Sequence, residues 1–253
     1  MKQNKKWLWL LLGVMLSTQI TQAQDTLNLR PFLKAKLAQL NKTKVYTNYL
    51  YDQIPVSTNP HLYAGVQIDS LNLDAYNYRQ LMLQHVAAKL NNDNFLTDYN
   101  IIDSINNFYF SQNKIAINVL SNVYQKIRAD ALDSGYIYYN NDSNFVSNAD
   151  TSLNPYTAFN VFAAGTWSPA YSGLNQQFIL PSSLFTNNIV NEIQKIEFKT
   201  NGSEWTRIYF DQGFEYNFAD SGTINISLKF TYATSEVTQV GFTFYLGKKS
   251  NLF

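Results

Sequence analysis

Two segments near the C-terminus alternate apolar and polar residues without a break. Residues 223–232 read TINISLKFTY, and residues 240–246 read VGFTFYL. A period of two puts every second side chain on the same face of a strand, so each segment has one apolar face. We therefore predict an antiparallel hairpin that buries one face of each strand.

Shorter runs of the same kind begin near residue 112. Turn-forming residues (Asn, Asp, Ser, Gly and Pro) separate them, which is typical of an antiparallel β-sandwich. The predicted strands are 114–127, 136–140, 159–165, 176–180 and 194–198. We assign residues 112–253 to one β-sandwich domain.

The preceding segment has a helical period instead. In residues 74–90, apolar residues recur at three- and four-residue steps after Asp74, which can cap a helix. Residues 96–110 predict a second helix. Its expected apolar stripe consists of Ile101, Ile102, Ile105 and Phe108.

Prolines shape the rest of this segment. Pro31 is expected at the first position of a shorter helix. The prolines within residues 45–65 disfavour helix in the residues before them, so we expect an extended chain there. Residues 24–111 are thus predicted to form a smaller helical and extended N-terminal segment.

Residues 1–23 have the three parts of a signal peptide. Lys2, Lys5 and Lys6 precede an apolar run from residue 7 to residue 16, and Ala23 is a small residue before the expected cleavage point. The run is too short to cross a bilayer, which takes about 20 residues. We expect export to the periplasm, cell surface or medium, with no membrane contact after cleavage.

Charge and cysteine content narrow the partner classes. The chain has no cysteine and a formal net charge of +1, which becomes −2 once the three lysines of the signal are removed. The lack of disulfides in an exported chain favours a bacterial source. A near-neutral surface gives no electrostatic footprint for nucleic acid or an anionic membrane.

Most metal and nucleophile sites need residues that are scarce here. With no cysteine and only His61 and His85, a Cys/His zinc site is excluded. The sequence also lacks a G-x-S-x-G turn, a P-loop and a dinucleotide-binding glycine pattern. We assign no catalytic residue, no metal ligand and no cofactor.

Three carboxylates stand out in residues 201–218, which read NGSEWTRIYFDQGFEYNF. Glu204, Asp211 and Glu215 lie there among aromatic residues. Glycoside hydrolysis needs two carboxyl groups about 5–10 Å apart around a cleft. These acids, with Glu192, are therefore the candidates for carboxylate catalysis.

The strand pattern of the same segment favours a different interpretation. If Phe210 pairs with Phe214 across a turn, Ile208 and Tyr216 share the buried face. Arg207 then lies diagonal to Glu215, close enough for an ion pair. We predict a hairpin with a solvated outer face rather than a catalytic pair.

Aromatic residues outside the expected core offer a second possibility. They can stack on a glycan or contact another domain or exported protein. The predicted binding surface consists of Trp167, Tyr171, Trp205, Arg207, Tyr209 and Glu215.

Several short motifs follow one another along the chain. They are YLYDQIP (49–55), KIAINVL and KIRADAL (within 114–132), VFAAG (161–165), FILPSSLFTNN (178–188) and IEFKTNGSEWTRI (196–208). Their order resembles the N-terminal region of large exported Bacteroidota proteins of uncharacterised function. With YNFADSGTINISLKF (216–230), the last motif also resembles the PKD-type Ig-like β-sandwich.

Two functions are compatible with these observations. The first is a non-enzymatic exported structural or interaction module, an Ig/PKD-like sandwich that binds another exported protein, a further domain or a glycan. The alternative is a secreted hydrolase that cleaves polysaccharide with paired carboxylates. The alternative requires at least one of the four candidate acids to meet another acid in an open cleft.

Overall fold

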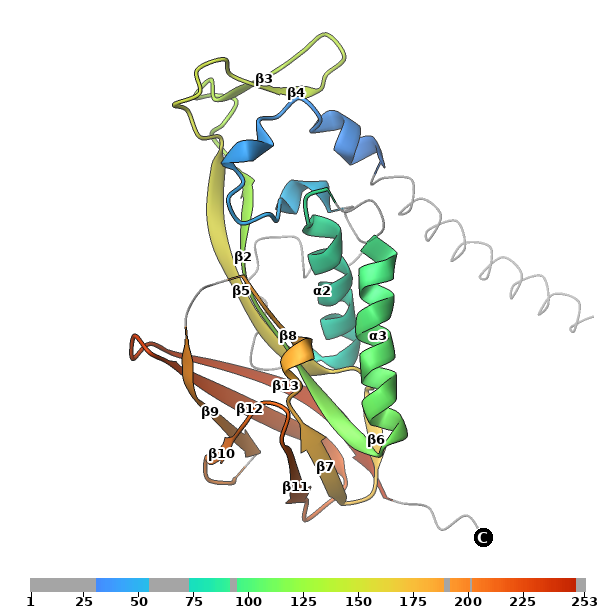
Figure 1. The fold of residues 1–253 in the computed structure, drawn as a ribbon. Coiled ribbons are helices and arrows are strands. Elements are labelled where there is room, and N and C mark those ends of the chain that lie inside the picture. The colour runs from blue at the N-terminus through green and yellow to red at the C-terminus, as the bar shows by residue number, and fades with distance from the viewer. Residues whose placement is uncertain (1–30, 55–72, 92–94, 189–191, 201, 249–253) are drawn as a thin grey trace, which may run out of the picture.

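The computed structural model describes residues 31–54, 73–91, 95–188, 192–200 and 202–248. These residues form a mainly β structure with two α-helices alongside a long pair of strands (Figure 1). The helical elements are a helix over residues 31–36, η1 (Lys42–Lys44), η2 (Tyr51–Gln53), α2 (Ala75–Ala88), α3 (Phe95–Ser111) and η4 (Ser182–Leu184). The strands are β1 (Leu73–Asp74), β2 (Lys114–Ile127), β3 (Ile137–Tyr139), β4 (Phe145–Ser147), β5 (Tyr156–Thr166), β6 (Ala170–Ser172), β7 (Asn175–Ile179), β8 (Phe185–Asn187), β9 (Ile193–Thr200), β10 (Thr206–Ile208), β11 (Gly213–Asn217), β12 (Gly222–Tyr232) and β13 (Val237–Gly247).

The predicted C-terminal hairpin is confirmed as the centre of the first sheet. β12 and β13 pair antiparallel, from Gly222 opposite Leu246 to Thr231 opposite Val237. β9 pairs with the other edge of β12, and β10 pairs with β9, both antiparallel. At the far edge, β1 and β6 pair with β13 in parallel.

The second sheet is built around β2. It pairs antiparallel with β5 on one edge and parallel with β7 and then β8 on the other, while β11 extends the sheet beyond β7. Both larger sheets are therefore mixed, which differs from the purely antiparallel sandwich expected from the sequence. The reason is that β1, β6, β7 and β8 reach their partners through crossovers rather than tight hairpins.

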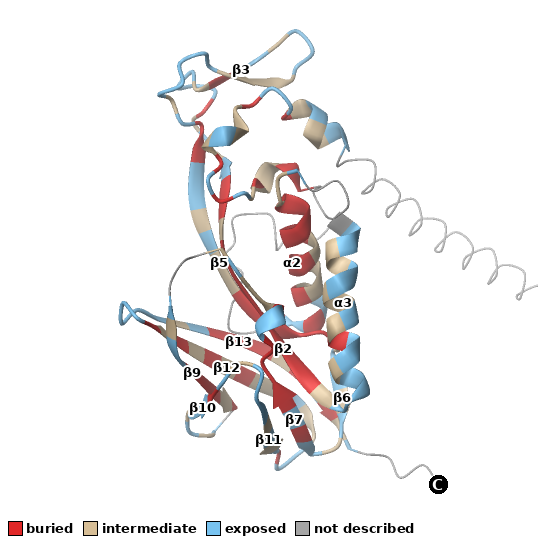
Figure 2. Cartoon of the chain, in the orientation of Figure 1, coloured by how far each residue is buried: buried red, intermediate tan, exposed pale blue. Residues whose placement is uncertain are grey.

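Aromatic side chains fill the core between the two sheets. Phe178 of β7 lies with its ring centroid 5.4 Å from that of Phe198 in β9. Phe162 of β5 meets Phe230 of β12 edge to face at 5.3 Å. The alternating residues of the hairpin face this core, as Figure 2 shows by their burial. They are Ile226, Leu228, Phe230, Tyr232, Val240, Phe242, Phe244 and Leu246.

Both longer helices predicted from the sequence are confirmed. α2 begins after Asp74, whose carboxylate accepts a hydrogen bond from the N–H of Asn77 at 2.7 Å. The predicted apolar stripe of α3 is confirmed only in part, because two of its four residues, Ile101 and Phe108, are 54% and 56% exposed. The helix is rotated so that Asn106 faces β2.

The rotation of α3 has a polar cause. Asn106 and Asn118 of β2 exchange amide hydrogen bonds at 3.0 and 2.9 Å, and both side chains are buried. A buried amide is costly unless its donors and acceptors are paired. This pair therefore decides which face of α3 meets the sheet, and Ile101 and Phe108 lie outside it.

The first described residues pack at the far end of β2. Residues 31–36 form the predicted short helix, and Leu37 and Leu40 are buried in a cluster with Ile137 of β3. Residues 45–54 are not simply extended, since they include η2. The remainder of the predicted extended segment and the predicted signal peptide lie outside the described residues.

Within the described part of the chain, none of the helices is long and apolar enough to cross a membrane.

Residues 206–217 do not form the predicted hairpin. In β10, Arg207 lies opposite Glu197 of β9, whereas in β11, Glu215 lies opposite Gln177 of β7 in the other sheet. Between the strands, Asp211 has a φ of 58° and its N–H donates to the carbonyl of Leu180 at 2.9 Å. The chain thus crosses from one sheet to the other.

Because of this crossing, the predicted strand pairing is wrong. The side chains predicted to point inward do point inward. Phe210 forms an isolated bridge with Leu180 rather than pairing with Phe214, and the expected Arg207–Glu215 ion pair is wrong. Ile208 is nevertheless buried in the core. Phe210, Phe214 and Tyr216 pack against that core.

Gly165 marks the place where α2 contacts β5. A Cβ atom on this residue would lie 2.5 Å from Cγ of Tyr78, whose side chain is fully buried. The Tyr78 ring therefore lies directly against the backbone of β5, and only glycine leaves room for it. This contact sets how closely α2 approaches the sheet.

We expect Gly165→Ala to destabilise the protein by about 2–3 kcal/mol, because the added methyl group overpacks a rigid contact. Gly213→Ala is the control, since its Cβ would meet only an ordinary contact at 3.7 Å; its effect should stay within about 0.5 kcal/mol. Urea unfolding measures both. In a Tyr78→Leu background the Gly165→Ala cost should shrink, and an undiminished cost would contradict the assigned clash.

A buried histidine links α2 to β2. His85 Nδ1 lies 2.7 Å from the hydroxyl of Tyr124, and the Asn122 amide nitrogen lies 3.1 Å from the same atom. Burial, with a smaller contribution from the charge of Lys89, lowers the pKa of His85 to about 3. Burial also raises the pKa of Tyr124 well above its usual value. The phenol of Tyr124 therefore donates a hydrogen bond to the neutral imidazole of His85.

This histidine makes stability depend on pH. An unfolded histidine takes up a proton near pH 6.5, whereas folded His85 does not until about pH 3. The unfolded state thus binds more protons between these values, and stability falls as pH falls. We expect the free energy of unfolding to be about 2 kcal/mol lower at pH 5 than at pH 7. Urea titrations should show a much flatter dependence for His85→Asn, and an unchanged slope would exclude His85 as its source.

Candidate functional site

The six residues predicted as a binding surface separate into three places. Trp167 and Tyr171 lie near α3, at the connection from β5 to β6 and in β6. Trp205, Arg207 and Tyr209 lie in or beside β10 in the first sheet, and Glu215 lies on β11 in the second. The structure therefore does not join them into one surface.

The candidate catalytic acids are dispersed as well. Asp211 accepts a hydrogen bond from the N–H of Ser182 at 2.9 Å, and the hydrogen bonds from Ser182 lower the pKa of this carboxyl. Glu215 accepts from the Gln177 amide at 3.0 Å. Neither these two acids nor Glu192 and Glu204 line the two pockets described next.

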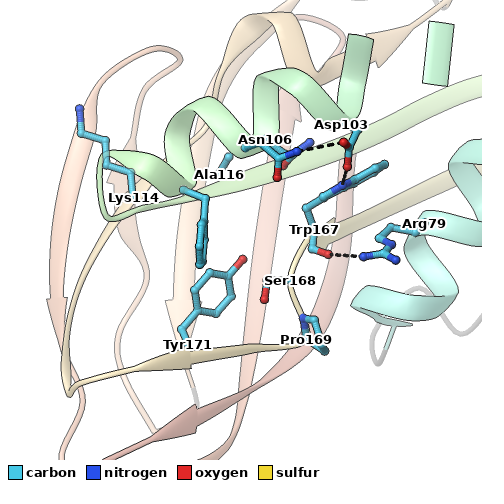
Figure 3. Close-up of a pocket in the computed structure, with 11 residues that line it drawn as sticks. Arg79, Asp103, Asn106, Lys114, Ala116, Trp167, Ser168, Pro169 and Tyr171 are labelled. Atoms are coloured by element: carbon cyan, nitrogen blue, oxygen red, sulfur yellow. Dashed lines mark hydrogen bonds between the residues drawn. The ribbon is translucent and has the colours of Figure 1, made fainter. Parts of the chain in front are cut away.

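One pocket lies where the last turns of α3 approach the β5–β6 connection. We call it the α3 pocket; its volume is about 220 Å³ (Figure 3). The lining residues come from α2, α3, β2 and the connection into β6. They are Arg79, Asp103, Asn106, Asn107, Phe110, Lys114, Ala116, Trp167, Ser168, Pro169 and Tyr171.

A hydrogen-bonded carboxylate forms the polar wall of the α3 pocket. The indole N–H of Trp167 donates to Oδ1 of Asp103 at 2.6 Å, and the Asn107 amide donates to Oδ2 at 2.9 Å. Arg79 donates to the Trp167 carbonyl at 3.5 Å, with its guanidinium carbon 5.8 Å from the indole centre. Figure 3 shows Asp103 and Arg79 reaching Trp167 from two different helices.

Trp167 is only 6% exposed, so it forms a wall rather than the open stacking platform expected from the sequence. Phe110, which is 57% exposed, is the open aromatic residue of the pocket, and the partly buried Tyr171 lies beside it with the ring centroids 6.2 Å apart. Burial raises the pKa of Tyr171 to about 12, so its phenol stays protonated at neutral pH. The pocket thus combines an aromatic rim with a fixed acidic group.

A second pocket, of about 530 Å³, lies near residues 31–37 at the far end of β2. Its lining is mainly apolar, including Leu37, Ile127 and Phe145. Asp52 reaches it, and one carboxylate oxygen accepts from the N–H of Ile127 at 2.7 Å. Burial raises the pKa of Asp52. None of the predicted site residues lies here.

Metal chemistry has no support in the side-chain geometry. Among the described residues, no group of three or more His, Cys, Asp or Glu side chains is placed to hold a metal ion. His85 is buried between α2 and β2, and His61 lies outside the described residues.

Sequence reasoning missed the polar half of the α3 pocket. Asp103, Asn107 and Arg79 were not among the candidate site residues predicted from the sequence. Their spacing did contain a signal, since residues four apart lie on one face of a helix. The sequence did not indicate how α3 is oriented about its axis, and this orientation turns the face toward Trp167.

A scan against protein-family models and a search of curated proteins gave no match to this chain.

The Trp167–Asp103 contact can be tested by a double-mutant cycle. Because the bond is partly buried and charge-assisted, we expect Trp167→Phe and Asp103→Ala to couple by about 1–2 kcal/mol in urea unfolding. Asp133→Ala removes an exposed acid from the β2–β3 connection and is the control. It should combine additively with Trp167→Phe to within about 0.5 kcal/mol. Additivity of the first pair would show that the hydrogen bond contributes nothing.

Proposed function

We propose that this protein is a non-enzymatic exported module that binds a saccharide unit of a glycan in the α3 pocket. The observation that carries the proposal is the carboxylate of Asp103, fixed by Trp167 and Asn107 at the wall of a pocket with the aromatic rim Phe110 and Tyr171. Small-ligand sites combine apolar or aromatic lining with a few fixed polar groups in this way.

Saccharides suit these groups for a physical reason. A sugar ring has faces of C–H groups, which pack on an aromatic ring, and hydroxyl groups along its edge, which donate to a carboxylate or an amide oxygen. The α3 pocket offers both, with Arg79 and Lys114 as further donors. Its volume of about 220 Å³ suits one sugar ring better than a longer segment.

The same geometry favours binding over hydrolysis. Asp103 is the single carboxylate among the residues that line this pocket, and both its oxygens accept hydrogen bonds. Hydrolysis by paired carboxyl groups requires a second acid within about 10 Å across the scissile bond. We therefore rank the hydrolase alternative second, since no contact among the described residues favours it.

Export and an interaction role complete the proposal. The N-terminal sequence supports secretion, and two facing sheets with a shared aromatic core support a relation to Ig/PKD-like sandwiches despite their mixed pairing. In this proposal, the β structure is a rigid support and α3 completes the binding pocket.

A glycan array followed by calorimetric titration of the best saccharide tests the function. Phe110→Ala removes a rim ring and should weaken binding about 5-fold, since aromatic stacking contributes about 1 kcal/mol. Phe108→Ala removes a ring of similar exposure from the same helix but outside the pocket, and should leave the affinity unchanged. Failure of every saccharide to bind, or equal effects of the two variants, would refute the proposal.

A further inference from the structure

The outer face of the first sheet carries an uneven distribution of charge. We define this outer face by the side chains that point away from the core on β9, β10 and β12 and beside β10. Its charged and aromatic members are Lys195, Glu197, Lys199, Trp205, Arg207, Tyr209 and Lys229. Four of these side chains are cations and one is a carboxylate, so the outer face has a surplus of three positive charges.

The carboxylate of the outer face is already engaged. Glu197 Oε1 lies 2.7 Å from Lys195 Nζ, and its Oε2 lies 2.8 Å from Lys229 Nζ. These hydrogen bonds lower the pKa of Glu197, so it stays ionised at neutral pH. Its charge cannot also neutralise Lys199 and Arg207, for which the described residues provide no ion pair.

Aromatic rings lie beside three of these cations. Lys229 Nζ lies 4.4 Å and Lys199 Nζ 5.6 Å from the ring centre of Trp205. The guanidinium carbon of Arg207 lies 5.2 Å from the ring centre of Tyr209, which is 48% exposed. Each ring attracts the cation that lies over it. The outer face thus places positive charge beside aromatic surface.

We propose that the outer face binds a carboxylated polysaccharide, with Lys199 and Arg207 pairing with its carboxylates. Charge complementarity indicates an anionic ligand, and several cations on one face of the sheet suit a chain that carries carboxylates on successive units. Tyr209 offers an aromatic surface beside the cations on which a sugar ring packs.

A protein partner fits this face less well. The cores of protein interfaces are depleted of charged residues, and lysine is depleted at interfaces in general. Three of the seven charged and aromatic members of the outer face are lysines, and its aromatic rings lie against cations. The positive surplus is concentrated on this face, because the formal net charge of the whole chain is only +1.

The outer face is a different surface from the α3 pocket. It lies on β9, β10 and β12, whereas the pocket is lined by α2, α3, β2 and the β5–β6 region. Binding of a carboxylated polysaccharide here does not depend on the proposed saccharide site, and the two can be tested separately.

Titration of the full chain with an oligomer of galacturonate at low and moderate salt tests the proposal. We expect binding that weakens as salt screens the charges, and no comparable binding of a neutral glucose oligomer of the same length. Lys199→Gln and Arg207→Gln should each weaken oligogalacturonate binding about 5-fold. Lys126→Gln is the matched control, because Lys126 is exposed and lies over the Phe159 ring at 5.5 Å but belongs to β2.

Three results would overturn the proposal. They are no binding of oligogalacturonate at low salt, an equal loss of affinity for Lys126→Gln, or equal affinity for single-stranded DNA of the same charge, which would indicate unselective attraction of polyanions. Lys199→Gln should weaken oligogalacturonate binding by the same factor in the unaltered chain and in a Phe110→Ala background. Loss of the Lys199→Gln effect in that background would place the binding in the α3 pocket.

Discussion

The burial of β2 on both faces is the constraint on which the rest of the structure depends. Ile115, Ile117 and Val119 point into the core between the sheets. On the opposite face, Ala116 packs in a cluster with residues of α3, and Leu120 packs in one with residues of α2. A strand in this position cannot carry polar side chains unless each finds a partner within the protein.

Most polar groups on β2 meet this requirement by joining the N-terminal elements one after another; the buried Oδ1 of Asn122 has no hydrogen-bond partner among the described residues. Asn118 pairs with Asn106 of α3, and Asn122 contacts His85 of α2. Further along, Gln125 accepts from the N–H of Thr47 and donates to the carbonyl of Lys44. The amide side chains of Asn118, Asn122 and Gln125 thus attach α3, α2 and the segment around residues 44–47 to β2. Their positions are specified by hydrogen bonds as much as by apolar packing.

The sequence predicted those parts of the fold in which one face is buried and the other is solvated. β12 and β13 fulfil this condition, so their alternation alone was sufficient to predict the hairpin. The same alternation correctly selected Ile208 and Tyr216 as inward residues but assigned them the wrong partners. The alternation shows whether a side chain points into the core or away from it. It does not show to which of the two sheets the strand belongs, because both sheets face the same core. The chain crosses from one sheet to the other at Asp211, and the same alternation of inward and outward side chains continues after the crossing.

The candidate sites were less predictable because they depend on the relative placement of distant elements. Trp167 and Tyr171 were recognised from composition, whereas Asp103 and Arg79 become part of the site only through the packing of α3 and α2. On the outer face, Trp205, Arg207 and Tyr209 were recognised by alternation. Their lysine neighbours Lys199 and Lys229 come from two other strands, and only the register of the sheet brings them together.

The two candidate surfaces differ in how their charges are compensated, and this difference determines what each can bind. In the α3 pocket, the carboxylate of Asp103 accepts hydrogen bonds from Trp167 and Asn107, and the cations Arg79 and Lys114 line the same pocket and offset its charge. On the outer face, the lone carboxylate is shared between two lysines while Lys199 and Arg207 lie against aromatic rings. A ring attracts a cation without cancelling its charge. The outer face therefore keeps a long-range positive field, whereas recognition in the α3 pocket depends on contact geometry.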